Sequence, residues 1–421
     1  MTISSEPLDA LGVGVGPANL SLAALLAPHP RLRAAFFDRA ERFRWHEGLM
    51  FPEAVVQVSF LKDLVTAVCP TSPYTFVNFL VVHKRLYRFI TAGFQRVPRW
   101  QFEEYFRWVA EQLPNLHHGR NVDEITLGND YFDVRIGDSV LHARNIVLGT
   151  GLVPRVPECA KPHLGPTLFH GYRFRLEQTT WAGRRVAIIG GGQTAAEIVL
   201  QMLARDDELP SHLTWISRRS NFQPLDESPF ANELFTPSYS DGFFALPDAE
   251  RRRLVDEQKL ASDGISPGLI DQLYRRLYEI EFRAGKGQRI LLRPSRELRA
   301  VARDGSSWAL DLHDRLNQRG ERVSADLVIL CTGFHYEPPA CIAPLLARIN
   351  RTHEEFECRK DFSVQWDGPP EMRIFLQNGA RLTRGIADPN LSLAAWRSAI
   401  IANSLAGEDL YAVDDLPSML G

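Results

Sequence analysis

Two glycine-rich turns, each between a short apolar run and a helix-forming run of small residues, constrain the fold of this chain most. The first spans residues 10–19 and reads Ala-Leu-Gly-Val-Gly-Val-Gly-Pro-Ala-Asn. The second spans residues 186–195 and reads Val-Ala-Ile-Ile-Gly-Gly-Gly-Gln-Thr-Ala. A strand, a glycine turn and a helix in this order bind the pyrophosphate of a dinucleotide at the helix N-terminus. The repeat therefore predicts an α/β fold with two Rossmann-like dinucleotide-binding domains.

The first turn has most of the features that a dinucleotide site needs. Gly14 allows the tight turn, and Gly16 lets the backbone approach the phosphates. Asn19 stands where a third glycine is usual. Asp38 ends the apolar run 34–37, where an acid would hold a ribose hydroxyl. An ordinary glycine turn between a strand and a helix is the alternative.

The second turn is the cleaner match, and the strand expected after its helix ends without an acid. Residues 213–217 read Leu-Thr-Trp-Ile-Ser, and two arginines follow. Guanidinium groups and a hydroxyl suit a 2′-phosphate, so we expect NADPH here; a solvated strand end is the alternative. The residues expected to bind it are Gly190, Gly192, Gln193, Thr194, Ser217, Arg218 and Arg219.

An acid at the first site and arginines at the second favour a flavoenzyme that binds FAD first and NADPH second along the chain. The strand 326–331 runs into Thr332 and Gly333, and we expect it to close the FAD domain beside the flavin. The expected FAD domain is discontinuous, with residues 1–178 and 327–421. The expected NADPH domain spans 179–326 and contains a helical substrate-binding insertion at 222–290.

Composition excludes several other classes of protein. The net charge of −3 gives no reason to expect nucleic acid as a partner, and no apolar run approaches the roughly 20 residues of a membrane span. The five cysteines are scattered without a Cys-x-x-Cys pair, which argues against a disulfide reductase and a zinc site. The start of the chain is polar and acidic, unlike a signal peptide. We therefore expect a cytoplasmic protein without a metal.

Two further segments carry structural information. Residues 42–80 mix aromatic residues, prolines and single charges without a helix or strand period. This composition is typical of an irregular segment over a ligand and equally of a structural loop. Residues 99–114 have helical spacing up to Pro114, and we interpret their aromatic stripe as core.

Taken together, these segments resemble the flavin-dependent N-hydroxylating monooxygenases, which are the lysine and ornithine N-hydroxylases of hydroxamate siderophore assembly. The resemblance covers nearly the whole chain. Residues 81–89, 258–265 and 393–397 look more like the lysine-type branch, which also contains diamine hydroxylases. Asp263 stands where the ornithine enzymes carry an asparagine. The most specific stretches are 43–46, 57–66, 70–76, 190–197, 230–237 and 385–397.

The resemblance implies that NADPH reduces FAD, that O2 is captured as a C4a-hydroperoxyflavin, and that an unprotonated terminal amine becomes an N-hydroxylamine. The amine is expected to be L-lysine or an aliphatic diamine such as cadaverine or putrescine. The alternatives are L-ornithine, a Baeyer–Villiger or sulfide-type oxygenation, and a non-enzymatic NADP(H)-sensing module. Family members often form dimers or tetramers, so we expect a homo-oligomer.

The resemblance also implies roles for individual residues. Lys62 would pair with a substrate carboxylate, although a surface lysine beside Asp63 is the alternative. Asn232 and Asp263 would bind the α-amino end of the substrate, or the distal ammonium of a diamine. The residues expected along FAD are Gly14, Gly16, Pro17, Asn19, Asp38, Trp45, His46, Gln57, Thr332 and Gly333. The residues expected near the substrate are Gln57, Lys62, Asn232, Asp263, Leu391 and Ser392.

Overall fold

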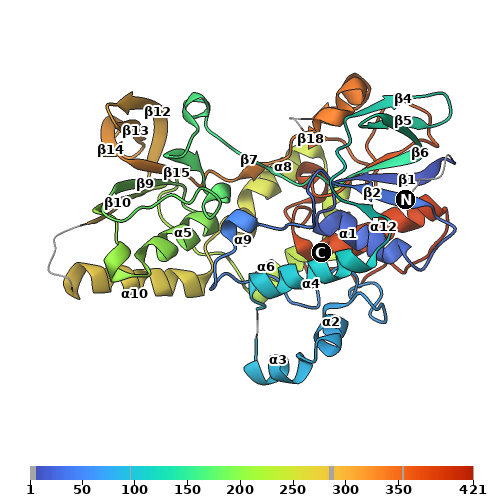
Figure 1. The fold of residues 1–421 in the computed structure, drawn as a ribbon, viewed down its shortest axis with the longest axis horizontal. Coiled ribbons are helices and arrows are strands. Elements are labelled where there is room, and N and C mark those ends of the chain that lie inside the picture. Colours follow the sequence, from blue (N-terminus) through green and yellow to red (C-terminus); the bar gives the residue numbers. More distant parts are fainter. Residues whose placement is uncertain (1–5, 95, 284–288, 353–354, 421) are drawn as a thin grey trace.

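The computed structural model describes residues 6–94, 96–283, 289–352 and 355–420, which form two lobes on separate sheets (Figure 1). The first sheet has the order β3-β2-β1-β6-β5-β4. Its strand β6 is long enough to pair antiparallel with β5 and then, nearer its end, parallel with β19. The strands are β1 (Leu8–Val13), β2 (Ala34–Phe37), β3 (Leu116–His117), β4 (Glu124–Leu127), β5 (Phe132–Ile136), β6 (Ser139–Leu148) and β19 (Ile374–Leu376).

The helices of the first lobe pack against β1 and against one another, while α2 and α3 project from the body (Figure 1). Helix α4 begins at Arg99 and ends at Gln112, and its aromatic stripe is buried as expected. A small hairpin, β17 (Arg351–Thr352) and β18 (Glu355–Phe356), also belongs to this lobe. The helices are α1 (Pro17–Leu26), α2 (Phe76–Val82), α3 (Leu86–Ala92), α4 (Arg99–Gln112), α11 (Arg381–Arg384) and α12 (Ala394–Ala406).

The second sheet is entirely parallel, in the order β11-β10-β9-β15-β8. Alternate residues of β9 face opposite sides, so Val186 and Ile188 pack against α5 and α10, while Ala187 and Ile189 pack against a three-stranded sheet. The elements are β8 (Leu168–His170), β9 (Arg185–Ile189), α5 (Gln193–Leu203), β10 (His212–Ile216), α10 (Pro267–Arg283), β11 (Ile290–Arg293), β12 (Arg296–Asp304), β13 (Ser307–Asp314), β14 (Arg319–Ala325) and β15 (Leu327–Leu330).

One expectation about this architecture is wrong. The strand before Thr332 was expected to close the first sheet, but β15 pairs with β9 and β8 in the second. The first sheet receives β19 instead. The expected boundaries at 178/179 and 326/327 therefore separate β8 and β15 from their own sheet. An all-apolar strand such as 327–330 is buried in either sheet, so its sequence does not select between them.

Thr332 and Gly333 lie where the chain crosses back between the lobes. Here β16 (Phe334–His335) pairs antiparallel with β7 (Val153–Pro154) of the outward crossing. Arg155 N donates to Gly333 O at 2.9 Å, and Thr332 Oγ1 donates to Arg155 O. The pair therefore holds the two crossing segments together.

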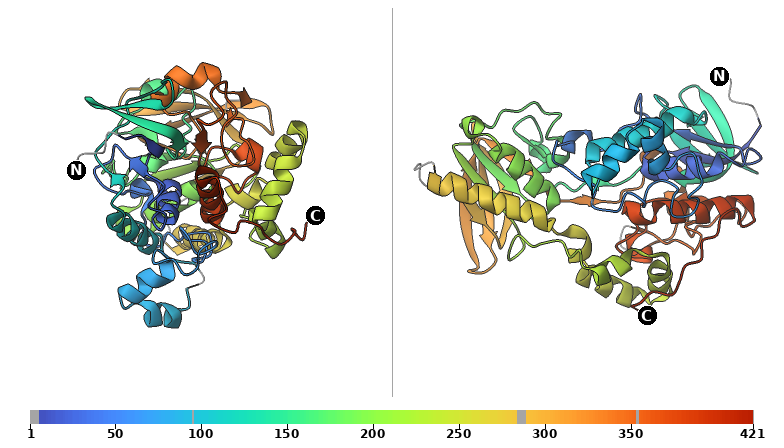
Figure 2. Two further views of the ribbon diagram at one scale, coloured as in Figure 1. Left: turned by 90° about the vertical axis from the view of Figure 1, so that its right-hand side faces the viewer. Right: turned by 90° about the horizontal axis from the view of Figure 1, so that it is seen from below.

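The helical insertion is present, but it divides between the lobes. The long helix α10 packs on α5 of the second lobe, whereas α7 and α8 pack on α11 of the first. Figure 2 shows α10 running along the second lobe and the shorter helices continuing it toward the first. Proline begins α10, as the sequence predicts. The shorter helices are α6 (Pro229–Asn232), α7 (Pro237–Ala245), α8 (Asp248–Glu257) and α9 (Leu260–Asp263).

Candidate functional site

The first glycine turn has the shape that a pyrophosphate needs. Gly14 has φ +86°, and a Cβ there would lie 2.7 Å from Gly149 O. Gly16 is the N-cap of α1 and has no side chain to satisfy the first N–H groups of the helix. Those N–H groups, together with the helix dipole, fit an anionic phosphate. Pro17 begins α1 and supplies no donor.

Asp38 lies at the tip of β2 and fixes this turn from the other side. Its Oδ2 accepts from Val15 N at 2.7 Å, and its Oδ1 accepts from Ala40 N at 2.8 Å. A carboxylate has about four lone-pair positions, so two remain for a ribose hydroxyl. The acid therefore positions the turn and is still able to accept from a ribose.

The expectation that Asn19 touches the pyrophosphate is wrong for this conformation. The residue is completely buried. Its Nδ2 donates to Gly14 O at 2.8 Å and to Val13 O at 3.2 Å. The Asn19 side chain therefore stabilises the turn through its carbonyl groups. A glycine at this position would make neither hydrogen bond.

We expect Gly14→Ala to abolish FAD retention, because a Cβ at this φ is strained and also meets the Gly149 carbonyl. The ratio of flavin to protein absorbance in the purified variant measures this loss. Gly137→Ala is the matched control: Gly137 has φ +58°, but a Cβ there meets nothing within 4 Å. Full flavin content in Gly14→Ala would contradict the assignment of the turn.

The second glycine turn has the same construction. Gly190 has φ +142°, and a Cβ there would lie 2.0 Å from Cys331 O. Gly192 caps α5 without a side-chain bond, so this helix also presents free N–H groups. Gln193 and Thr194 begin α5. The Gln193 amide is bonded internally, to Ser266 N at 2.9 Å and Glu197 Oε1 at 3.0 Å.

A cavity of about 600 Å³ opens beside the end of β10. Its lining contains four cationic and three acidic side chains, and the guanidinium groups among the cations suit a 2′-phosphate. Arg218 and Arg219 were expected here, whereas Lys259 and Arg315 were not. The cavity is lined by Arg218, Arg219, Gln223, Asp256, Glu257, Lys259, Leu260, Glu297 and Arg315.

Ser217 does not reach this cavity, contrary to expectation. The residue is 1% exposed, and its Oγ accepts from Arg219 N at 3.1 Å. Ser217 therefore fixes the backbone of Arg219 and leaves phosphate binding to the cations.

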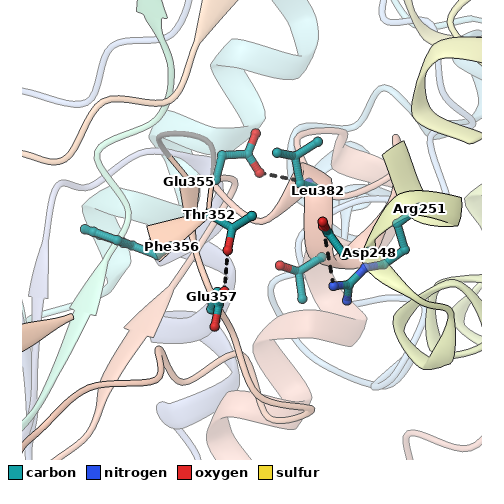
Figure 3. Close-up of a pocket in the computed structure, with 8 residues that line it drawn as sticks. Asp248, Arg251, Thr352, Glu355, Phe356, Glu357 and Leu382 are labelled. Carbon is teal, nitrogen blue, oxygen red and sulfur yellow. Dashed lines mark hydrogen bonds and ion pairs between the residues drawn. The ribbon is translucent and has the colours of Figure 1, made fainter. Parts of the chain in front are cut away.

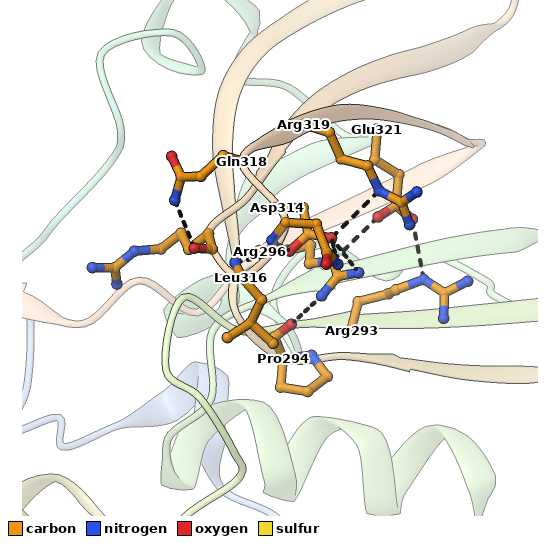
Figure 4. A network of polar contacts seen from close by, with 10 residues as sticks. Arg293, Pro294, Arg296, Asp314, Leu316, Gln318, Arg319 and Glu321 are labelled. Carbon is orange, nitrogen blue, oxygen red and sulfur yellow. Dashed lines mark hydrogen bonds and ion pairs between the residues drawn. The ribbon is translucent and has the colours of Figure 1, made fainter.

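Arg315 lines the cavity and follows Asp314, which is the centre of a network of polar contacts (Figure 4). The fully buried Asp314 accepts from Asn317 Nδ2 at 2.8 Å and pairs with Arg296 at 3.0 Å. These contacts, of which the Asn317 bond is the largest, lower the pKa of Asp314 to about 2. The turn after β13 is thereby fixed, and Arg315 Nη1 donates to Arg218 O at 3.2 Å.

The segment 42–80 is irregular up to residue 75, apart from a short 3-10 turn at Glu47–Leu49, as its composition predicts. Its last five residues differ from that expectation, because they belong to α2. The Trp45 ring packs 5.1 Å from Phe106. His46 has φ 52°, and burial together with the nearby Arg99 cation lowers its pKa to about 4. His46 is therefore neutral near pH 7. Gln57 is exposed on the same segment.

Lys62 is partly buried, which does not fit the alternative of a surface lysine beside Asp63. Asp63 is buried, and its carboxylate accepts from Val65 N, Thr66 N and Phe76 N at 2.7–2.9 Å. Lys62 Nζ instead donates to Phe235 O at 3.3 Å, and burial lowers its pKa. Among the described residues, no ion pair of Lys62 is found, and burial is the only cause that shifts its pKa. A half-buried cation without an ion partner is suited to bind an anion.

The large apolar cluster of the first lobe connects several of the expected site segments. It includes Leu64 and Phe235, which follow Lys62 and Asn232 along the chain, and Trp45 and Leu391 pack against it. Asn232 is exposed, and its Nδ2 donates to Glu227 O at 3.4 Å. Ser392 is buried and donates from N and Oγ to Asn390 Oδ1 at 2.8 Å each.

Asp263 differs from its expected setting. Its carboxylate faces Arg219 and Arg381 at 4.0 and 3.9 Å, so cations already surround the group that was expected to bind an ammonium. The sequence contained no signal for Arg381, because a lone arginine after Gly-Ala predicts nothing about its partner.

Comparison with known proteins identifies the group to which this architecture belongs. The family described as L-lysine 6-monooxygenase/L-ornithine 5-monooxygenase matches residues 6–336, most of the chain. The chain belongs to this family. The family and the fold class expected from the sequence are both confirmed.

Individual family members are similar over almost the full length. The L-lysine N6-monooxygenase of Escherichia coli is 40% identical over 99% of this chain and 98% of its own. A cadaverine monooxygenase of Erwinia amylovora, solved with FAD, has a TM-score of 0.91 at 30% identity and covers 97% of this chain and 96% of its own. A Kutzneria ornithine N-hydroxylase, solved with reduced FAD, NADP+ and L-ornithine, has a TM-score of 0.88 at 29% identity, with 96% and 99% coverage.

The structure of the present chain has a second, smaller cavity of about 190 Å³ between the β17–β18 hairpin, α8 and α11 (Figure 3). Glu355 lines it and accepts from Leu382 N at 2.8 Å. Burial is the main cause that raises the pKa of Glu355 to about 7. The cavity is lined by Asp248, Arg251, Thr352, Glu355, Phe356, Glu357, Leu382 and Thr383.

We expect Glu355 to make stability fall as pH rises. The unfolded carboxyl loses its proton near 4.5, whereas the folded one keeps it to about 7, so the folded state binds more protons in that interval. The free energy of unfolding should fall by on the order of 3 kcal/mol across it. Thermal melts at about pH 5 and about pH 8 test this, because Glu355→Gln should lose less stability than the wild type between the two pH values. The opposite contribution of His46, whose pKa is lowered, is the same in both proteins. The exposed Glu371→Gln is the control, and an equal pH effect in Glu355→Gln would contradict the assignment.

Within the described ranges, no helix combines the length and apolar character that crossing a bilayer requires. The same residues contain no group of three or more histidine, cysteine or acidic side chains placed to hold a metal ion. The five cysteines are all free thiols.

Proposed function

We propose that this chain uses FAD, NADPH and O2 to hydroxylate the terminal amine of L-lysine, an early step of hydroxamate siderophore biosynthesis. The observation that carries the choice of lysine is Lys62, which is half-buried, has no described carboxylate partner and bonds to the carbonyl of Phe235. A substrate carboxylate would supply the missing anion and favour the charged form of Lys62. The 40% identity to a lysine N6-monooxygenase agrees with this choice.

Each cofactor has a site that fits it. The turn at Gly14, the N-terminus of α1 and Asp38 would hold FAD, and the turn at Gly190, the N-terminus of α5 and the cationic cavity would hold NADPH. Bound FAD supplies electron transfer from NADPH and the activation of O2. The chain supplies orientation, because residues from several segments position the amine relative to the flavin.

The chain must also keep the reacting amine unprotonated and exclude water. Trp45 and Leu391 pack on the apolar cluster, and burial in such surroundings lowers the pKa of an amine. His46 is neutral, so it adds no cation beside Trp45. The nucleophile is the amine nitrogen itself. The reaction therefore needs no general base to deprotonate a water or a hydroxyl group.

The second candidate substrate is an aliphatic diamine. A cadaverine monooxygenase is among the proteins with the same fold, at a TM-score of 0.91. Asn232 or Asp263 would then be the groups closest to its second ammonium. Exposed Asn232 remains available, whereas Asp263 already faces two arginines.

An amine panel tests the proposal. The FAD-loaded enzyme is given NADPH with lysine, cadaverine, putrescine or ornithine, and hydroxylamine and hydrogen peroxide are both measured. We expect hydroxylamine with lysine above all other amines. Formation of peroxide alone with every amine would contradict N-hydroxylation, and a preference for cadaverine would favour the diamine.

Two further properties follow as proposals. We infer that the protein acts in the cytoplasm, where NADPH is supplied, and that it forms a homo-oligomer. Light scattering coupled to size-exclusion chromatography measures the second property, and a monomer at micromolar concentration would contradict it.

A further inference from the structure

The end of α9 lies where the two lobes meet, and the carboxylate of Asp263 lies there between two guanidinium groups. Its Oδ2 is 4.0 Å from Nη2 of Arg219, which follows β10 of the second lobe. The same atom is 3.9 Å from Nη2 of Arg381, which begins α11 of the first lobe. Both distances permit an ion pair but exceed a hydrogen bond. The carboxylate therefore attracts two cations and is hydrogen-bonded to neither.

Both arginines are anchored to the same helix end by other atoms. Arg219 Nη1 donates to the main-chain oxygen of Asp263 at 2.8 Å. Arg381 Nη2 contacts Ser262 Oγ at 3.4 Å, and that hydroxyl donates to Asp263 Oδ1 at 3.0 Å. The Nε atom of Arg381 is buried and has no partner within the described part of the chain. A small movement of the carboxylate would therefore hydrogen-bond it to either arginine.

Arg219 also lines the cationic cavity proposed for the 2′-phosphate of NADPH. A guanidinium has five N–H donors, so Arg219 is able to bind a phosphate and keep its main-chain bond. Asp263 nevertheless opposes that phosphate, because it competes for the charge of Arg219 and repels a second anion. The positive charge of Arg381 offsets the negative charge of Asp263, and so weakens the repulsion between this carboxylate and the phosphate.

We propose that Asp263 and Arg381 are positioning residues that set the affinity for the 2′-phosphate and transmit its presence between the lobes. The inference rests on the NADPH site proposed above. When the phosphate engages Arg219, Asp263 pairs fully with Arg381, and the contact between α9 and α11 tightens. When the phosphate leaves, the carboxylate is shared again.

Helix α11 connects the contact between Asp263 and Arg381 to the segment that we expect beside the flavin. Arg381 begins the helix, and the chain from Thr383 to Asp388 is buried throughout. That segment leads into the 3-10 turn Leu391–Leu393, which carries two of the residues expected beside the flavin and the reacting nitrogen. A buried segment of this kind moves as a unit, because close packing resists local adjustment.

Calorimetric titration of the FAD-loaded protein tests the proposal, with 2′,5′-ADP as the probe and 5′-AMP as the same nucleotide without the 2′-phosphate. We expect Asp263→Asn to tighten 2′,5′-ADP binding by about fivefold and Arg381→Gln to weaken it by a similar factor. The double variant should match Asp263→Asn alone, because Arg381 acts only through that carboxylate. Binding of 5′-AMP should stay within about twofold in all three.

Asp256 provides a control, since it lines the same cavity. Asp256→Asn should change the affinity for 2′,5′-ADP by the same factor whether position 381 is arginine or glutamine. Additive effects of the Asp263 and Arg381 variants, or equal effects on both nucleotides, would overturn the coupling. If the wild-type protein does not prefer 2′,5′-ADP over 5′-AMP, the NADPH site itself is wrong. If it does and the variants match it, only the coupling is wrong.

Discussion

The Lys62→Ala variant should lose most of its kcat/KM for L-lysine and keep nearly all of it for cadaverine. Lysine carries a carboxylate that the Lys62 ammonium would bind in a half-buried setting, whereas cadaverine carries none. Truncating one partner of a buried charge pair costs about 2–5 kcal/mol. That cost corresponds to roughly 30- to 4000-fold, and we expect the lower end because Lys62 is only partly buried. Steady-state hydroxylamine formation with the two amines measures the ratio.

Two further variants separate charge from packing. Lys62→Met keeps most of the side-chain stem but removes the charge, so it should behave as the alanine variant does toward lysine. Lys84→Ala removes an exposed lysine that follows α2 and should leave both substrates unaffected. If Lys62→Ala lowered kcat/KM equally for lysine and cadaverine, the residue would support the fold and would not bind the substrate carboxylate.

The dinucleotide sites were predictable because each depends on local backbone. Gly14 and Gly190 both adopt positive φ, a conformation that glycine adopts readily, and both precede helices without side-chain caps. The spacing of such residues is visible in a sequence. The same is true of α4, whose buried stripe follows the helical period.

Pairing across the molecule was not predictable. The strand 327–330 is apolar on both faces and would suit either sheet, and only its observed register with β9 and β8 assigns it to the second. Arg315 reaches the cavity because the turn around Asp314 is fixed, a contact between sheet and loop that no local pattern encodes. Asn19 and Ser217 stand at the sequence positions where cofactor-binding residues are expected, but both side chains are buried in the protein.

The ion pair between Arg99 and Glu197 joins the lobes, and removing one partner should destabilise the protein strongly. Arg99 of α4 contacts both oxygens of Glu197 of α5, at 2.8 and 3.1 Å, and donates to Leu49 O at 2.7 Å. The side chains are 12% and 7% exposed. Arg99→Ala leaves Glu197 buried with Gln193 as its remaining described hydrogen-bond donor, and breaking such a pair costs about 3–5 kcal/mol.

Urea unfolding of the FAD-free protein measures this cost as a lower midpoint of the transition. The double variant Arg99→Met with Glu197→Leu should recover most of the loss, because two apolar side chains leave no buried charge without a partner. Arg205→Ala is the control, since Arg205 pairs with Asp207 at 2.8 Å on the exposed surface and should change the midpoint little. If Arg99→Ala were as harmless as Arg205→Ala, the crossing strands and the insertion helices would hold the lobes together without this pair.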